Sequence, residues 1–302
     1  MHLIAIWIGV RQRFRRFHAS LSVTPAQRDD ALAKQLDVRE VLHRAYYGVT
    51  SDDPIGIIVG SWGKGTQVSP PSDIDVFFTL PVTEFERFNS YADNKQSSLL
   101  QAVRATLLAT WPQTGMRGDG QVVVVDFNSI AVEIVPVFRY NNIEYVMPDT
   151  NDGGSWRRVR PFASLIHIDE ADRLANGNVR TLAQMTKTWR RECNVPSLKS
   201  FHLELLVANF MQEYPYREHD YFWYDWFMRD FFNWLCGRAR SYLLDPSTNW
   251  LIYLGDDWLS RAESARDRAL KACVHEYNDE TIEAGSEWQM IFGVKIPIHV
   301  LG

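Results

Sequence analysis

The chain has 302 residues, of which 46% are hydrophobic and 13% aromatic, enough to bury a sizeable core as one large or two closely packed domains. Its formal net charge of -5 argues against a dedicated nucleic-acid-binding protein, because neutralising phosphates requires surplus Lys and Arg. Three cysteines are too few and too scattered for a disulfide framework or a thiolate metal site, so we expect free thiols in a reducing, cytoplasmic setting.

The first predicted element is a helix close to the N-terminus. Residues 3–10 form an apolar run with basic residues after it and no small-residue cleavage site, an order that does not fit a secretory signal. The run is also too short to span a membrane. We expect the helix to pack on the body of the protein, and the alternative is a contact with a membrane surface or a partner. A second helix is predicted from the Thr24-Pro25 cap to about Tyr47.

The next part of the chain reads as strands with one helix among them. Strands are predicted at residues 55–59, 74–80, 121–127 and 130–138, with a helix at 90–111. From about Ala163 the pattern is helical almost throughout, at residues 178–193, 198–212, 221–243 and 258–284. We therefore expect an α+β fold in which a mixed lobe, residues 1–162, is packed on an all-helical lobe, residues 163–302.

The stretch "GSWGKGTQVSPPSDIDVFFTL" places acids inside an apolar strand. Residues i and i+2 of a strand point to the same side, so Asp73 and Asp75 project together. Two carboxylates this close repel each other unless a metal or protons neutralise them, and Mg²⁺ is the natural oxygen-liganded occupant. Upstream, backbone N–H groups and the hydroxyl at Gly60 and Ser61 can hold phosphate oxygens in a turn.

A third acid completes this candidate site. Glu133 lies mid-strand in "IAVEIVPVF", where burial of an unpaired carboxylate is costly and a metal partner would explain it. The competing acid, Asp126, lies at a strand end beside the predicted Asn128-Ser129 turn, where solvent or turn N–H groups suffice. Three acids on two strands beside a phosphate-binding turn predict a two-metal phosphoryl-transfer site.

These motifs also carry a family resemblance. G-S, then G-T, then S-D-I-D, then a lone acid before I-V-P resembles the DNA polymerase β-type nucleotidyltransferase superfamily. Five later motifs resemble the bacterial cyclic-oligonucleotide synthases, the DncV-like CD-NTases related to cyclic GMP-AMP synthase: "NDGGSWRRVRP", "KTW", "SLKSFHLELLVANF", "DP" and "WQMIFGVKIP". The resemblance covers residues 35–297. It implies a polymerase β-like nucleotidyltransferase lobe and a helical lobe like that of oligoadenylate synthase.

The resemblance implies roles for residues of the helical lobe. Lys187 and Ser200 fall on the family's lysine and serine that hold the donor triphosphate. If Ser197 caps the following helix, Ser200 lies in its first turn, where free N–H groups and the helix dipole favour phosphate. Phe201 falls on an aromatic that stacks on a nucleobase, with core packing as the alternative. The third acid is Glu133 where aspartate is frequent among relatives, and the longer side chain can still reach a metal.

The implied activity is Mg²⁺-dependent condensation of two or three nucleoside triphosphates, ATP and/or GTP, into a cyclic di- or trinucleotide for antiphage signalling. Two Mg²⁺ ions are implied, for which Mn²⁺ can substitute. The alternatives are a linear product, transfer to another acceptor, a polymerase-like nucleic-acid enzyme, or an inactive nucleotide-binding scaffold. We expect no membrane-spanning segment and no dedicated nucleic-acid partner. Some relatives are modified at the C-terminus by a ubiquitin-transfer-like partner, which makes Gly302 a candidate acceptor.

Overall fold

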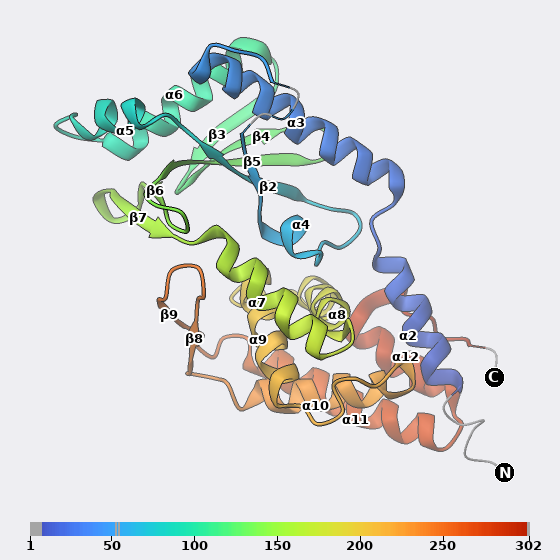
Figure 1. Ribbon diagram of the computed structural model, residues 1–302. Helices are drawn as coiled ribbons and strands as arrows, with labels where there is room; N and C mark the ends of the chain where they lie inside the picture. The colour runs from blue at the N-terminus through green and yellow to red at the C-terminus, as the bar shows by residue number, and fades with distance from the viewer. Residues whose placement is uncertain (1–7, 52, 54, 301–302) are drawn as a thin grey trace.

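The computed structural model describes residues 8–51, 53 and 55–300, and the chain forms two lobes in it (Figure 1). The lobe that holds the sheet has its own buried apolar cluster, and the helical lobe has another. The α+β architecture predicted from the sequence is therefore confirmed. The predicted acceptor Gly302 lies outside the described residues.

A mixed sheet forms the scaffold of the first lobe. The strands run in the order β1, β2, β5, β4, β3, and β5 continues into a pairing with β6, which pairs with β7. Only β2 and β5 are parallel among these pairs of the described sheet. The bounds are β1 (Ile57–Ile58), β2 (Asp73–Thr79), β3 (Gly115–Asp119), β4 (Val122–Asp126), β5 (Ala131–Arg139), β6 (Tyr145–Asp149) and β7 (Ser155–Val159).

Along β2, buried apolar residues alternate with the two predicted acids. Ile74, Val76 and Phe78 are fully buried in the cluster beneath the helices that cover one face of the sheet. Because neighbouring strand residues point to opposite faces, Asp73 and Asp75 face the other way. That second face is turned toward the helical lobe, and the short helix α4 (Gly60–Lys64) lies between the two (Figure 1).

The outer helices of this lobe begin and end at recognisable signals. In α3 (Pro25–Tyr47) the Gln27 amide donates to Thr24 Oγ1 at 3.2 Å, which confirms the predicted cap. The helix ends at Gly48, whose φ of 72° is left-handed. The predicted helix at 90–111 is α6 (Lys95–Thr110) and starts later. Two further elements of the lobe are α5 (Val82–Asn89), which was not predicted, and the 3₁₀ turn η1 (Asn151–Gly153).

The helical lobe includes the first described helix of the chain. Buried apolar side chains of α2 (Ile8–Leu21), Phe14 and Phe17 among them, belong to the core of this lobe. The expectation that the N-terminal helix packs on the body is confirmed from residue 8 onward, whereas residues 3–7 of the predicted run lie outside the described residues. The remaining helices are α7 (Pro161–Leu174), α8 (Asn178–Glu192), α9 (Ser200–Glu213), α10 (Tyr224–Cys236), α11 (Leu259–Tyr277), α12 (Thr281–Phe292) and the 3₁₀ turns η2 (Tyr221–Trp223) and η3 (Gly293–Lys295).

Two predicted helices are too long. The helix expected at 221–243 ends at Cys236, and the chain then forms the hairpin of β8 (Tyr242–Leu244) and β9 (Leu251–Tyr253). The helix expected at 258–284 is divided into α11 and α12, with Asp279 in the left-handed region at φ 60°. An apolar periodicity that continues past such a turn hides the break, since both helices bury a face in one core.

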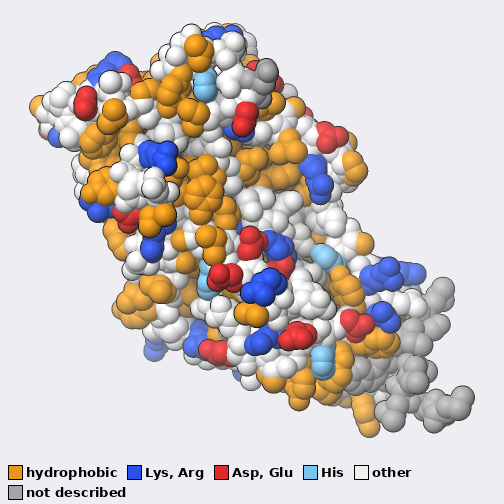
Figure 2. Space-filling view, viewed as in Figure 1, with side chains coloured by type: hydrophobic (Ala, Val, Ile, Leu, Met, Phe, Trp, Pro, Cys, Tyr) orange, Lys and Arg blue, Asp and Glu red, His pale blue; other side chains and the backbone are white. Residues whose placement is uncertain are grey.

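The surface of the helical lobe carries charges of both signs. On the face shown in Figure 2, basic and acidic side chains are interspersed over the helical lobe. In the part of the chain that the structure describes, no helix combines the length and the apolarity needed to cross a bilayer. The three cysteines are free and partly buried.

Candidate active site

Three acids meet on the face of the sheet that is turned toward the helical lobe. β2 and β5 are parallel neighbours whose register places Asp75 opposite Glu133 and Asp73 opposite Ala131. Residues paired in this way project from the same face, so all three predicted acids share it. They are half-buried, whereas Asp126 at the end of β4 is exposed and pairs with Arg117 at 3.5 Å.

Nearby positive charge is too small to neutralise the three acids. Burial raises the pKa of Asp75 to about 7, and the negative charges of Asp73 and Glu133 add to that rise while Lys64 opposes it. Burial and the charge of Asp73 also raise the pKa of Glu133, with partial relief from Arg117. Like charges that are buried together in this way are stabilised by a cation.

The donor set fits a hard divalent metal that substrate helps to hold. Among the described residues, no group of three or more His, Cys, Asp or Glu side chains is arranged to hold a metal ion by itself. Mg²⁺ commonly takes one or two carboxylates and completes its shell with waters and substrate phosphates. An edge of carboxylates with raised pKa values matches that second arrangement, in which a bound phosphate supplies the missing oxygens.

The turn before β2 is fitted closely around Asp75. Gly60 has a φ of 59°, and a Cβ added to it would lie 1.8 Å from Asp75 Oδ2. The Trp62 indole donates to the Asp73 carbonyl at 2.7 Å and ties α4 to the strand. The sequence predicted a phosphate-binding turn at Gly60 and Ser61; the structure places both at the start of α4, directly over the acids.

A cavity of about 670 Å³ lies between the lobes, within the size range of ligand sites. Every predicted site residue except Glu133 lines it: Gly60, Ser61, Asp73, Asp75, Lys187, Ser200 and Phe201. Glu133 reaches the site only through its place beside Asp75 in the sheet. Two residues that the sequence reasoning missed, Lys64 and Glu204, also line the cavity.

A second cavity, of about 380 Å³, is also lined by Asp75. It shares Gly60, Lys64, Asp75 and Phe201 with the first. Its other walls come from Val59 after β1, from the strands β2, β5, β6 and β7, from the start of α7 and from the β8–β9 hairpin, and they include Trp250 and Arg157. The ring of Trp250 packs against the Arg157 guanidinium at 4.6 Å. Asp75 is thus accessible from two cavities.

The predicted residues Ser200 and Phe201 line the first cavity, but the cap of their helix differs from the prediction. Ser200 is the first residue of α9, but Lys199 takes the cap position, so the predicted Ser197 cap is wrong. Ser200 stays in the first turn. Phe201 is half-buried against the helical core, and Lys64 Nζ lies 4.8 Å from its ring centroid. Core packing and cavity lining therefore apply to Phe201 together.

Lys187 is held by protein groups. Its Nζ donates to the Thr66 carbonyl at 3.1 Å, to Thr66 Oγ1 at 3.0 Å and to the Glu204 carboxylate. Burial alone would raise the pKa of Glu204, but Lys187 and Lys64 outweigh it and lower that pKa to about 2. Glu204 is therefore an ionised acid in the wall of the cavity. The signal in the sequence was a single charge inside "HLELLVANF", of the same kind that singled out Glu133.

Comparison with known proteins gives matches in sequence. A family model described as the Second Messenger Oligonucleotide or Dinucleotide Synthetase domain matches residues 8–171. The cyclic AMP-AMP-AMP synthase of an Acinetobacter strain is 27% identical over 158 residues, which are 51% of this chain and 45% of that protein. The chain thus matches less than half the length of this curated relative.

Solved structures share the fold over almost the whole chain. CdnC from E. coli MS115-1, solved with ATP, has a TM-score of 0.69 and 19% identity, and the match covers 95% of this chain and 98% of CdnC. The Vibrio cholerae cyclic AMP-GMP synthase DncV, solved with a linear intermediate, has a TM-score of 0.65 and 14% identity, covering 98% of this chain and 90% of DncV. CdnG from Bradyrhizobium diazoefficiens, solved with GTP, has a TM-score of 0.64 and 11% identity, covering 94% and 95%. The fold is that of these polymerase β-like nucleotidyltransferases.

Proposed function

The chain belongs to the family of second messenger oligonucleotide or dinucleotide synthetases, and from this membership we propose that it condenses two or three nucleoside triphosphates into a cyclic di- or trinucleotide. We propose ATP, GTP or both as substrates, since the similar structures of CdnC and CdnG were solved with ATP and GTP. Two Mg²⁺ ions, or Mn²⁺ in their place, are the proposed cofactors, and antiphage signalling is the proposed role of the product.

The observation that carries this proposal is that Asp75 lines two cavities. The larger cavity presents Ser61, Lys187 and Ser200, whose hydroxyl and ammonium groups suit a triphosphate. The smaller one is lined by apolar strand residues and by Trp250 of the hairpin, which suit a nucleoside. Two nucleotides that enter these cavities approach the same carboxylate edge from two sides, as the joining of one to the other requires.

Each acid has a distinct place in the proposed reaction. Asp73 and Asp75 lie on one strand and would be shared between both metal ions, while Glu133 beside Asp75 would serve the ion next to the attacking hydroxyl. The chemistry expected of bound Mg²⁺ is to lower the pKa of the attacking ribose hydroxyl and to neutralise the leaving pyrophosphate. Residues of the larger cavity would hold the donor triphosphate in line, and a second round on the linear intermediate would close the ring.

Two alternatives differ from this proposal in what the protein releases. A linear oligonucleotide or a modified acceptor would use the same three acids and differ only in the product. An inactive nucleotide-binding scaffold would be expected to lack an acid, and all three are present on one face of the sheet.

Product analysis tests the proposal. The purified protein is incubated with all four nucleoside triphosphates and Mg²⁺, terminal phosphates are removed with phosphatase, and resistant products are identified by mass and nuclease digestion. We expect a phosphatase-resistant product whose mass is that of two or three nucleotides without a terminal phosphate. Linear products alone, or no product, would contradict the cyclisation.

The contact between Gly60 and Asp75 gives a prediction with an internal control. Gly60→Ala places a methyl group where the Asp75 carboxylate lies, so we expect product formation to fall at least about 100-fold as the acid is displaced. Gly48 has a similar positive φ but open space around it, so Gly48→Ala carries the backbone strain without the clash. Initial rates and thermal unfolding of both variants make the measurement. Equal rates for the two would contradict the proposed role of the Asp75 position.

A further inference from the structure

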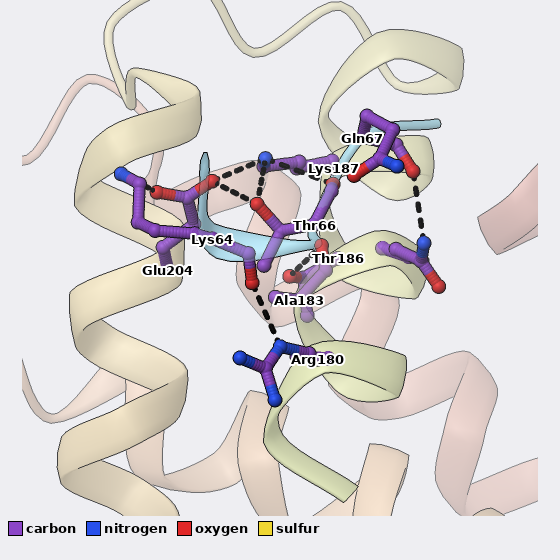
Figure 3. A network of polar contacts seen from close by, with 9 residues as sticks. Lys64, Thr66, Gln67, Arg180, Ala183, Thr186, Lys187 and Glu204 are labelled. Carbon is purple, nitrogen blue, oxygen red and sulfur yellow. Dashed lines mark hydrogen bonds and ion pairs between the residues drawn. The ribbon is translucent and has the colours of Figure 1, made fainter. Parts of the chain in front are cut away.

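Residues 64–67 form a strap that ties the catalytic sheet to the helical lobe (Figure 3). Three of its carbonyls accept hydrogen bonds from side chains of α8: Lys64 from Arg180 at 2.7 Å, Thr66 from Lys187 at 3.1 Å and Gln67 from Gln184 at 2.8 Å. The three donors are spaced by four and then three residues, which places them on one face of α8. One helix face is thus devoted to holding this strap.

At the centre of the network, Glu204 binds groups from both lobes. Glu204 of α9 is 2% exposed and accepts hydrogen bonds from Lys64, Thr66 and Lys187. Figure 3 shows the Glu204 carboxylate between the two lysines. Lys64 is 4% exposed and belongs to α4 at the catalytic sheet, whereas Lys187 belongs to α8. Glu204 lies four residues after Ser200, one turn farther along the same face of α9.

The charges of this cluster do not balance. Two ammonium groups share one carboxylate, which leaves a surplus of one positive charge in a buried cluster at the wall of the larger cavity. Surplus buried charge is costly unless a neighbour of the opposite sign offsets it. Asp73 near Lys187 and Asp75 near Lys64 offset part of this charge, and the cavity that these residues line leaves room for a further anion. A bound polyphosphate is an anion of the right charge for that space.

We propose that Glu204 is a positioning residue that holds Lys64 and Lys187 at the base of the nucleotide cavity, where their positive charges attract the triphosphate. The inference rests on the proposed function, since it takes a nucleoside triphosphate as the ligand. It adds Lys64 to the triphosphate-binding groups and gives Glu204 a task in binding, beyond joining the lobes. Preorganised charges of this kind need no rearrangement when the ligand arrives.

The test replaces the charge of Glu204 and keeps its size. In Glu204→Gln both lysines lose their shared counter-charge, and the nearby charges that remain are the other lysine, Asp73 near Lys187 and Asp75 near Lys64. Burial already lowers the pKa of Lys187, so the variant should carry a neutral lysine at high pH. We expect the affinity for a non-hydrolysable ATP analogue with Mg²⁺ to fall at least about tenfold at pH 8.5 and to recover toward the wild-type value at pH 6.5. In steady state KM should rise more than kcat falls.

Glu276→Gln is the matched control. Glu276 is also 2% exposed and also pairs with a buried cation, Arg13 at 2.9 Å, but it lies outside both cavities. Both substitutions should lower the unfolding temperature, and only Glu204→Gln should change calorimetric affinity and its dependence on pH. Unchanged affinity in Glu204→Gln, or an equal and pH-independent loss in both variants, overturns the inference.

A second variant keeps the inference testable if Glu204→Gln does not fold. Lys64→Met removes one ammonium and leaves Glu204 paired with Lys187, so affinity should fall at least about fivefold without a new pH dependence. Unchanged affinity in Lys64→Met would overturn the role of Lys64. Because calorimetry does not depend on product, a wild type that binds the analogue but makes no cyclic product would contradict the proposed function alone.

Discussion

Asp73→Asn and Asp75→Asn are each expected to reduce product formation at least about 1,000-fold while the fold stays intact. Both acids lie on β2 and line the larger cavity, and each substitution removes a negative charge that the proposed metal ions share. The measurement is the initial rate of product formation with Mg²⁺ and nucleoside triphosphates. Normal activity in either folded variant would contradict the two-metal assignment.

Asp75→Asn is also expected to stabilise the folded chain when no metal is bound. The pKa of Asp75 is raised to about 7 in the folded chain, above its unfolded value, so the folded state binds more protons between those two values. The unfolding free energy of the wild-type chain therefore falls as the pH rises toward 7, because the ionised Asp75 carboxylate is poorly tolerated where it is buried. In a metal chelator at pH 8, Asp75→Asn should unfold a few degrees above the wild type, and the difference should vanish near pH 4.

Glu133→Gln is expected to lower turnover by roughly three orders of magnitude, because it removes the one acid of β5 that faces Asp75. Glu133→Asp should keep partial activity, since the charge survives while the reach shortens. Asp126→Asn is the control: this acid is exposed, lies at the end of β4 and pairs with Arg117, so its loss should cost little. Comparable losses in Glu133→Gln and Asp126→Asn would contradict the choice of Glu133.

The acids could be found from the sequence because they interrupt apolar strands. Asp75 and Glu133 each stand between buried residues of β2 or β5, Asp73 begins β2 directly before a buried residue, and that local conflict is visible without a structure. The parallel pairing that sets Asp75 opposite Glu133 was not visible, because it joins strands far apart in the chain. The local sequence pattern therefore identified the residues, and the sheet topology shows that they are neighbours.

The missed elements have equally specific causes. β3 is mostly exposed and contains Gly115 and Gly118, so it lacks the apolar alternation of a half-buried strand. The link from Lys64 to Glu204 spans 140 residues and depends on how the lobes pack. Glu204 was missed although it is a charge within the apolar run "HLELLVANF", and only the packed lobes reveal the two lysines that it binds.

A crystal structure with Mg²⁺ and a non-hydrolysable nucleotide tests the central claim most directly. The account predicts that Asp73, Asp75 and Glu133 coordinate the metal ions and that the triphosphate lies in the larger cavity beside Ser61, Lys187 and Ser200. Metal coordinated by Asp126, with Glu133 turned into the core and the triphosphate outside that cavity, would contradict it.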